Sequence, residues 1–228
     1  MIGIIGAMQI EIDKINAALE NKCEEKVSSV TFTRGTLCGK EVVTAVCGVG
    51  KVFAAICTEA MIIKYAPDVI INTGVGGTLT DKLSIGDVAV SDFVCQHDMD
   101  TSPLGDPVGL LSGINIVKIP ADREISKKMA ECVEKTGVKS LIGTIASGDQ
   151  FINSKEKKEY ITSTFDAVCC EMEGGSIGHV CYVNGVKFAV IRAISDGAGD
   201  DSHMDYPTFA RLAAERSADA VKLFVEEY

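Results

Sequence analysis

Short apolar runs alternate along this chain with stretches in which apolar positions recur every three or four residues. The runs contain β-branched residues and end at glycine or polar turns, so they predict buried β-strands. They span residues 1–5, 30–37, 41–47, 68–73, 85–93, 114–119, 140–146, 167–170 and 186–196. Helices are predicted at 52–65 and 123–136, after residues 8, 154 and 173, and from 205 almost to 228. This alternation predicts an α/β sandwich with a largely parallel or mixed central sheet.

The run 186–196, V-K-F-A-V-I-R-A-I-S-D, is the clearest of these strands. It is mostly apolar, precedes the turn-forming G-A-G-D, and ends on Ser195 and Asp196. Ligands of open α/β sheets bind outside the carboxyl ends of the strands, so these two side chains stand where a reacting group would stand. Alternatively, Asp196 only begins a loop or an Asx-turn.

Two further carboxylates follow predicted strands in the same way. Glu11 lies in the first turn of the helix after the first strand, and Glu173 lies where another strand runs into a helix. An acidic residue in a first turn also suits the positive end of the helix dipole, which is a purely structural explanation for Glu11. The repeated arrangement favours a common site, with Phe151, Met172 and Tyr206 as nearby apolar candidates.

Size and charge limit the class of protein. The 228 residues fit one α/β domain, residues 1–228, large enough to bury most of the surface that the unfolded chain would expose. A formal net charge of −10 offers no basic face, so nucleic acid and anionic membranes are poor partners. No apolar run approaches the roughly 18 residues that span a bilayer, and the N-terminus lacks the basic region of a signal peptide. We therefore expect a cytoplasmic protein.

The nine cysteines do not have the spacing of a disulfide framework or a metal site. No C-x-x-C occurs, only three histidines are present, and the cysteine count is odd. Reduced, buried thiols are the better explanation, and they suit a reducing compartment. The clearest examples are Cys47, Cys57, Cys132 and Cys181.

Two glycine-rich segments resemble nucleotide-binding loops but lack required residues. Segment 48–51 ends in Gly-Lys, yet Ala45 stands where a phosphate loop has its first glycine and Val52 where it has Ser or Thr. Segment 74–77 lacks the third glycine of the dinucleotide fingerprint, because Leu79 stands there. The first is better interpreted as the entry to a helix, and the second as a glycine turn that allows a small ligand close to the backbone.

Carboxylates among apolar side chains suggest acid–base chemistry on a neutral, partly aromatic substrate. Three carboxylates are also able to hold a magnesium ion, but nothing in the sequence resembles the phosphate cradle that usually accompanies one. Neither a metal nor another cofactor is therefore expected.

Seven short segments stand in the same order as in one known family. They are G-I-I-G-A-M-Q-I-E, C-G-V-G-K, V-I-I-N-T-G, I-G-D-V-A-V-S-D, S-G-D-Q-F-I-N, C-E-M-E-G and R-A-I-S-D. Together the segments resemble the 5′-methylthioadenosine/S-adenosylhomocysteine nucleosidases of the nucleoside phosphorylase superfamily. The resemblance implies a three-layer α/β/α sandwich around a mixed sheet, and cleavage by water of the bond between adenine and a 5′-thio-substituted ribose.

The resemblance also implies a role for each polar site residue. Asp196 matches the general acid that protonates N7 of the purine, and Ser195 supports it. Glu11 matches the residue that holds and activates the attacking water, near Arg192. Glu173 matches the carboxylate that binds the ribose hydroxyls.

Other matched positions surround the substrate. The resemblance implies that Phe151 stacks on adenine, that the backbone of Ile152 reads its edge, and that Met172 lies against the sugar. The remaining positions line the ribose, the water site and the 5′-thio side, and they are Met8, Val49, Val75, Gly76 and Tyr206.

This assignment agrees with the chemistry of the reaction. Adenine leaves poorly as an anion, so its protonation should accelerate cleavage roughly 10²–10⁴-fold. Asp196 must then be protonated, a state that burial would favour by raising its pKa. The ribose becomes cationic in the transition state, and Glu173 and Glu11 offset that charge. An acid on one face and a base with water on the other predict inversion at the anomeric carbon.

The sequence departs from the family at two places. Val75 occupies a position in the glycine segment where better-known members carry serine. Residues 97–109, H-D-M-D-T-S-P-L-G-D-P-V-G, differ from the usual segment after the shared His-Asp. In the family this loop helps to close the pocket for the 5′-substituent across a homodimer interface. The resemblance thus predicts a homodimer but leaves the preferred 5′-substituent open.

Two rival functions remain. A purine nucleoside phosphorylase of the same fold would need cationic groups for phosphate. The N-terminal turn instead offers Glu11, and Gly86 stands where the bacterial hexameric phosphorylases carry an arginine. The other rival is a non-catalytic nucleoside-binding protein, because fold does not determine function. The joint presence of Glu11, Glu173 and Asp196 argues against it.

Overall fold

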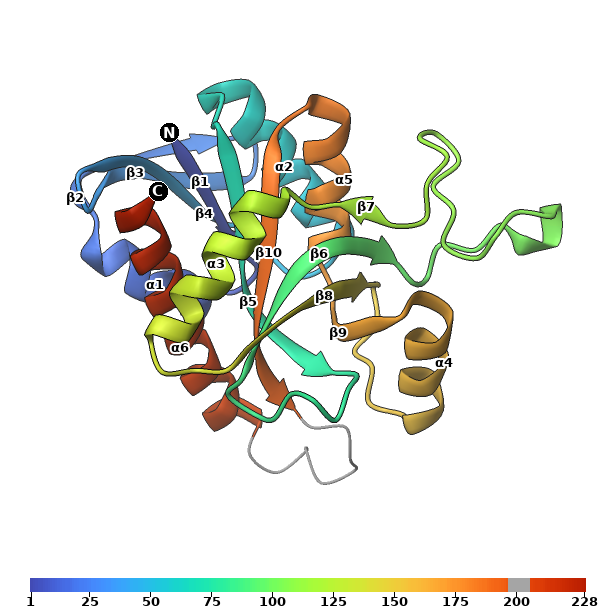
Figure 1. Ribbon diagram of the computed structural model, residues 1–228. Coiled ribbons are helices and arrows are strands. Elements are labelled where there is room, and N and C mark those ends of the chain that lie inside the picture. Colours follow the sequence, from blue (N-terminus) through green and yellow to red (C-terminus); the bar gives the residue numbers. More distant parts are fainter. Residues whose placement is uncertain (197–205) are drawn as a thin grey trace.

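A ten-stranded mixed sheet forms the centre of the protein in the computed structural model, which describes residues 1–196 and 206–228 and the side chains of 1–196 and 209–228 (Figure 1). The strands are β1 (Ile2–Gly6), β2 (Glu20–Val27), β3 (Val30–Leu37), β4 (Lys40–Val46), β5 (Val69–Thr78), β6 (Val88–Gln96), β7 (Ile119–Pro120), β8 (Ser140–Ser147), β9 (Ala167–Glu171) and β10 (Lys187–Asp196). The helices are α1 (Gln9–Ala18), α2 (Lys51–Tyr65), η1 (Ser102–Leu104), α3 (Arg123–Lys135), α4 (Lys155–Phe165), α5 (Gly174–Asn184) and α6 (Tyr206–Glu227).

Strand β5 is the centre of this sheet, because it pairs in parallel with β1 on one side and with β10 along its full length. Its end also pairs antiparallel with β9. Since β10 pairs with β6, β6 with β8, and β8 with β9, these strands close into a ring. Strands β4, β3 and β2 continue the sheet beyond β1. The prediction of a mixed central sheet is confirmed.

Helices cover both faces of the sheet, as the predicted sandwich requires (Figure 1). On one face α1, α3 and α6 bury a cluster that includes Ile15, Val133 and Phe224. On the other face α2 and α5 bury a second cluster that includes Met61 and Ile177. The three-layer α/β/α fold predicted from the resemblance is therefore confirmed.

Most predicted elements lie within a few residues of the observed ones, and the strand predictions need correction at two places. Strand β2, E-N-K-C-E-E-K-V, was not predicted, because it is an edge strand whose residues are exposed or half-buried and so has no apolar alternation. The strand predicted at 114–119 is wrong over most of its length, because only the two-residue strand β7 forms there. Ile116, in the predicted range, makes only an isolated bridge to Leu111.

The glycine segment 74–77 is not the predicted turn, because it forms the second half of β5. A Cβ atom at Gly74 would lie 2.5 Å from Glu11 Oε1, and one at Gly77 would lie 2.7 Å from Asp196 Oδ2. Glycine is needed here because two carboxylates pack directly on the strand.

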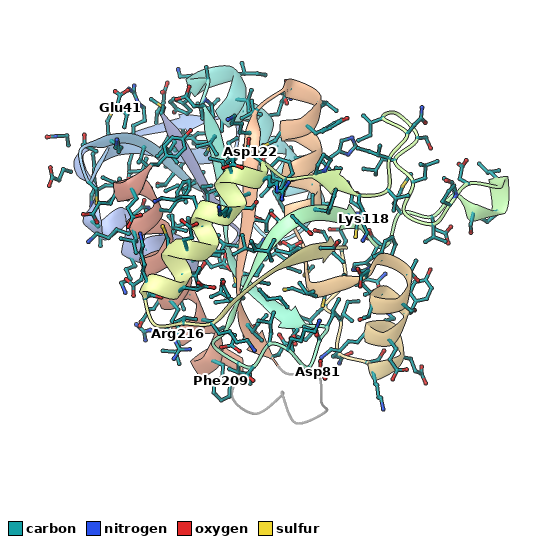
Figure 2. The ribbon with its side chains drawn as sticks, viewed as in Figure 1. Glu41, Asp81, Lys118, Asp122, Phe209 and Arg216 are labelled. Carbon is teal, nitrogen blue, oxygen red and sulfur yellow. The ribbon has the colours of Figure 1, made fainter. Side chains whose placement is uncertain are left out.

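Local signals place the helix ends. Asp122 accepts hydrogen bonds from the N–H groups of Glu124 and Ile125 at 3.1 and 3.0 Å and so caps α3 (Figure 2). Ser154 Oγ accepts a hydrogen bond from Lys157 N at 3.3 Å and so caps α4, where a helix is predicted after residue 154. Gly137, with φ of +79°, follows the end of α3 as expected.

The segment between β6 and β7 projects away from the rest of the molecule (Figure 1). We call residues 99–109 the projection. Its base is closed by a hydrogen bond of 2.8 Å from Gly109 N to Met99 O, and it carries η1 with Leu104 almost fully exposed. Residues 97–109 therefore form a loop, as the resemblance implies.

All nine cysteines are free, and the four predicted to be buried thiols are buried. None of the described helices is long and apolar enough to cross a membrane.

Replacement of the fully buried Phe224 by alanine should destabilise the protein by about 3–5 kcal/mol, the usual cost of deleting a core phenylalanine. Urea denaturation followed by circular dichroism measures the change. Leu212→Ala in the same helix is the control, because Leu212 is 44% exposed and should cost about 0.5 kcal/mol or less. Similar losses for both variants would contradict the packing of α6 described above.

Candidate active site

A cavity of about 580 Å³, including space open to solvent, lies at the carboxyl ends of β1, β4, β5, β8, β9 and β10. It contains most of the residues predicted from the sequence. Those that line it are Met8, Glu11, Val49, Val75, Gly76, Phe151, Ile152, Met172, Glu173, Ser195 and Asp196. Segments far apart in the sequence thus converge on one volume suited to a small molecule.

Glu11 caps its own helix and lines the cavity at the same time. Its Oε2 accepts hydrogen bonds from Ala7 N and Met8 N at 2.8 and 2.9 Å, and its Oε1 accepts from Val75 N at 3.0 Å. Burial raises the pKa of Glu11, while the charge of Arg192 and the three N–H groups oppose that rise. The helix-end explanation is therefore correct, and it does not exclude a chemical role.

Asp196 reaches the cavity because β10 bulges before its last residue. The register with β5 shifts between Ile194 and Asp196, so Ser195 and Asp196 both line the cavity, which regular alternation along a strand would prevent. Ser195 Oγ donates to Asp196 Oδ1 at 3.1 Å. The buried ammonium of Lys158 in α4 lies 3.8 Å from Asp196 Oδ2, a contact that the sequence did not predict.

Glu173 is the third carboxylate of the cavity. Its Oε1 accepts a hydrogen bond of 2.8 Å from Gly50 N, just before α2 begins. Burial and the neighbouring charge of Glu171 raise the pKa of Glu173 to about 7, although Arg192 and the Gly50 N–H act in the opposite direction. This carboxyl group therefore changes its charge near neutral pH.

A buried ion pair lies beneath Glu173. Arg192 donates to Glu171 Oε2, and its Nη2 also donates to Asn72 Oδ1 at 2.5 Å. The same nitrogen lies 3.8 Å from Glu173 Oε2. Arg192, predicted near the water site, does not line the cavity, but its charge acts on Glu11 and Glu173, which do.

Glu171 is the main polar residue that sequence reasoning missed. Besides Arg192, it binds Ser147 Oγ, and it accepts hydrogen bonds from Glu173 N and Gly174 N at 3.0 and 2.7 Å. It also lines the cavity. The available signal was the pair of glutamates in C-E-M-E-G, both at the end of one predicted strand.

The apolar part of the cavity combines buried and exposed side chains. Ile152 is buried, whereas Phe151 is 55% exposed and stands at the opening. Cys170 also lines it, and burial raises the pKa of its thiol to about 12, so it is an apolar wall rather than a nucleophile. Tyr206 begins α6, but its side chain lies outside the described part of the chain.

The charges around the cavity restrict what it can do. None of the described residues that line it carries a cationic side chain. In the described ranges 1–196 and 206–228, no three histidine, cysteine or carboxylate side chains are grouped to hold a metal ion. Four carboxyl groups line the cavity, and backbone N–H groups hold Glu11, Glu171 and Glu173. Carboxyl groups in such a setting are suited to proton transfer and to the binding of hydroxyl groups.

Comparisons with known proteins show which family the chain resembles over nearly its whole length. The model of the phosphorylase superfamily matches residues 1–226. A curated 5′-methylthioadenosine/S-adenosylhomocysteine nucleosidase of Shewanella putrefaciens is 38% identical over 99% of this chain and 98% of its own.

Two solved structures have nearly the same fold. One is a mutant of the Helicobacter pylori 5′-methylthioadenosine/S-adenosylhomocysteine nucleosidase with 5′-methylthioadenosine in the active site. It is 33% identical to this chain with a TM-score of 0.94, and the match covers 100% of this chain and 98% of that one. The other is a futalosine hydrolase of the same species, which is 34% identical with a TM-score of 0.94 and covers 100% and 97%.

The raised pKa of Glu173 has a consequence for stability. Between pH 4.5 and about 7 the folded protein holds a proton that the unfolded chain releases, so this group's contribution to stability falls as pH rises. Glu173→Gln cannot ionise. The melting temperature of the variant relative to wild type should therefore increase between pH 5 and pH 8.

Scanning calorimetry at the two pH values measures this difference. Glu226→Gln, on the exposed side of α6, is the control for loss of a carboxylate elsewhere. If the melting temperature of Glu173→Gln fell relative to wild type as pH rose, the assignment of a raised pKa would be wrong.

Proposed function

The chain belongs to the phosphorylase superfamily and, within it, to the 5′-methylthioadenosine/S-adenosylhomocysteine nucleosidases, and we propose that it hydrolyses the N-glycosidic bond of these nucleosides. The products are adenine and the 5′-substituted ribose. The observation that supports this most is the convergence of Glu11, Glu173 and Asp196 in one cavity with Phe151 at its opening.

In the proposed mechanism the bond between C1′ and N9 breaks, and its electron pair goes to adenine. Asp196 transfers a proton to N7, so adenine leaves as a neutral base. Ser195, whose hydroxyl donates to Asp196 Oδ1, holds the carboxyl group in place. Glu11 accepts a proton from the attacking water, which forms the new bond to C1′.

Glu173 acts on the sugar in this mechanism. Its carboxyl group binds the ribose hydroxyls, and its negative charge offsets the positive charge that develops on the ribose. Gly50 N and the ion pair of Arg192 with Glu171 hold it at the cavity wall. With the acid and the water on opposite faces of the sugar, the product has inverted configuration at C1′.

The apolar residues hold the base and the sugar. Phe151 stacks on adenine, and the backbone of Ile152 hydrogen-bonds to its edge. Met172 lies against the ribose, while Met8 and Val49 line the 5′-thio side. Stacking on Phe151 would also bury a ring that is 55% exposed without substrate.

Water rather than phosphate is the proposed nucleophile. A phosphate site needs cationic donors, and the described lining has none. The resemblance places Gly86 where the hexameric phosphorylases carry an arginine. Arg216 of α6 donates to the carbonyl oxygen of Gly86 at 2.9 Å, but Arg216 does not line the cavity (Figure 2).

Futalosine hydrolysis is a second candidate activity. One of the matched structures, 34% identical to this chain, is a futalosine hydrolase. 5′-Deoxyadenosine, which is smaller, fits the same proposed site.

We further propose that the protein acts as a homodimer. Exposed apolar side chains gather near the start of α2, and Leu104 extends from the projection. The members on and just before α2 are Val49, Val52, Phe53 and Ile56. Pairing of these surfaces buries apolar area and brings residues 97–109 of each subunit to the partner's pocket.

The domain organisation, the compartment and the pathway of the protein follow from the same proposal. Residues 1–228 act as one domain, since one sheet joins strands from Ile2 to Asp196. Nine free thiols suit a reducing cytoplasm, and the reaction suits methionine salvage.

The purified protein should release adenine from 5′-methylthioadenosine in phosphate-free buffer, at a rate that added phosphate does not change. Asp196→Asn should lower kcat about 10²–10⁴-fold, because it removes the proton for N7. An absorbance assay for adenine and chromatography of the ribose product measure both. Phosphate-dependent release would contradict hydrolysis, and binding of 5′-methylthioadenosine without turnover in wild type would favour a binding protein.

Phe53→Asp should convert a wild-type dimer of 24.2 kDa chains into monomers, with a dimer dissociation constant raised roughly 30-fold or more, because a buried aromatic anchor is worth about 2 kcal/mol. Analytical ultracentrifugation measures this. Leu212→Asp on α6 is the control, since Leu212 is exposed on the opposite helical layer. A wild-type monomer, or a dimer that survives Phe53→Asp, would contradict the proposed interface.

A further inference from the structure

Lys51 belongs to no nucleotide motif and does not line the cavity, yet it makes several contacts beside it. Its Nζ donates to Asp98 Oδ1 at 2.6 Å and to Gln96 Oε1 at 3.2 Å. The Lys51 and Asp98 side chains are only 18% and 17% exposed, so solvent screens this ion pair less than a surface pair.

Asp149 joins the same two residues through its backbone and its side chain. Lys51 N donates to Asp149 Oδ1 at 2.8 Å, and Asp149 N donates to Asp98 Oδ2 at 2.9 Å. Burial alone would raise the pKa of Asp98, but the hydrogen bonds from Lys51 and Asp149 and the charge of Lys51 lower it. The three residues thus form a closed cycle, which we call the Lys51 clamp.

Each member of the clamp is next to a different part of the nucleoside site. Lys51 follows Gly50, whose N–H holds Glu173 Oε1 at 2.8 Å. Asp149 immediately precedes Gln150 and Phe151, which line the cavity. Asp98 immediately precedes Met99, where the projection begins.

The backbone around the Lys51 clamp is closely packed at two glycines. A Cβ atom at Gly50 would lie 3.0 Å from Asp149 Oδ1, and Gly50 has φ of +100°, which favours glycine. A Cβ atom at Gly148 would lie 2.4 Å from His97 Nε2. Glycines therefore let the start of α2, the segment before Phe151 and the base of the projection approach one another closely.

We propose that Lys51 is a positioning residue. It fixes the segment that holds Glu173 relative to the segment that carries Phe151, and it connects both segments to the base of the projection. The proposal rests on the nucleosidase function for its kinetic consequence. The ammonium of Lys51 neutralises Asp98, so Asp98 can bind Asp149 N without leaving an uncompensated charge. Loss of that cation releases the projection and the segment before Phe151 together.

Hydrogen–deuterium exchange tests the clamp without any turnover. In Lys51→Met, peptides that cover 98–109 and 148–153 should exchange roughly 10-fold faster, because the bonds that hold them open more often. Lys64→Met is the matched control, since Lys64 lies in the last turn of α2 and pairs with the exposed Glu25 at 2.7 Å. Unchanged exchange in both peptides of Lys51→Met would overturn the proposal, whatever the enzyme's activity.

Steady-state kinetics with 5′-methylthioadenosine gives the second readout. Lys51→Met should lower kcat/KM about 10–100-fold, mostly through KM, because a displacement of about 1 Å at a positioned group costs up to roughly 10²-fold. Lys51→Arg should recover most of this loss, and Lys64→Met should keep the wild-type value. Wild-type kcat/KM in Lys51→Met, in a protein that hydrolyses the substrate, would contradict the proposal.

A double-mutant cycle separates positioning from a general loss of stability. Asp98→Asn removes the same interaction, so Lys51→Met combined with Asp98→Asn should lose no more than about twofold beyond the worse single variant. Independent losses that multiply, with melting temperatures falling in parallel, would indicate only a structural role and would overturn the proposal.

Discussion

The buried ion pair of Arg192 with Glu171 is the interaction on which the site depends most. It joins β10 to the end of β9, and its third partner, Asn72, belongs to β5. Removal of one partner from such a pair usually costs about 3–5 kcal/mol, because the remaining charge stays buried and uncompensated. The pair therefore constrains the strand ends from which Glu173 and Asp196 reach the cavity.

Backbone N–H groups provide the second constraint. Glu11 accepts from three of them, Glu171 from two and Glu173 from one. Carboxylates held in this way need no cation in the cavity, so the site keeps a negative field without closing its space with a lysine or arginine. Such a field stabilises a substrate that becomes positively charged as its bond breaks, and it opposes the entry of an anion such as phosphate. The electrostatics of the cavity and the proposed choice of water as nucleophile thus have the same origin.

Sequence reasoning succeeded where the signal was local. The apolar run before Ser195 and Asp196 predicted β10, and the spacing at 52–65 predicted α2. It failed where the cause lay in another segment. Strand β2 has no apolar face because its residues at the edge of the sheet are exposed or half-buried. The glycines at 74–77 continue a strand because β10 pairs with them, and they are glycines because Glu11 and Asp196 pack on them.

The sequence by itself determined which strand ends carry Glu173 and Asp196, because a strand and its polar end are contiguous in the chain. Only the tertiary structure decided how these groups behave. The pKa of Glu173 rises through burial and through Glu171, and Arg192 faces the ion pair rather than the cavity. Lys51 contacts Asp98 and Asp149, which lie 47 and 98 positions further along the chain, respectively. Burial and contacts between distant segments depend on how the strands pair, and no local pattern encodes that pairing.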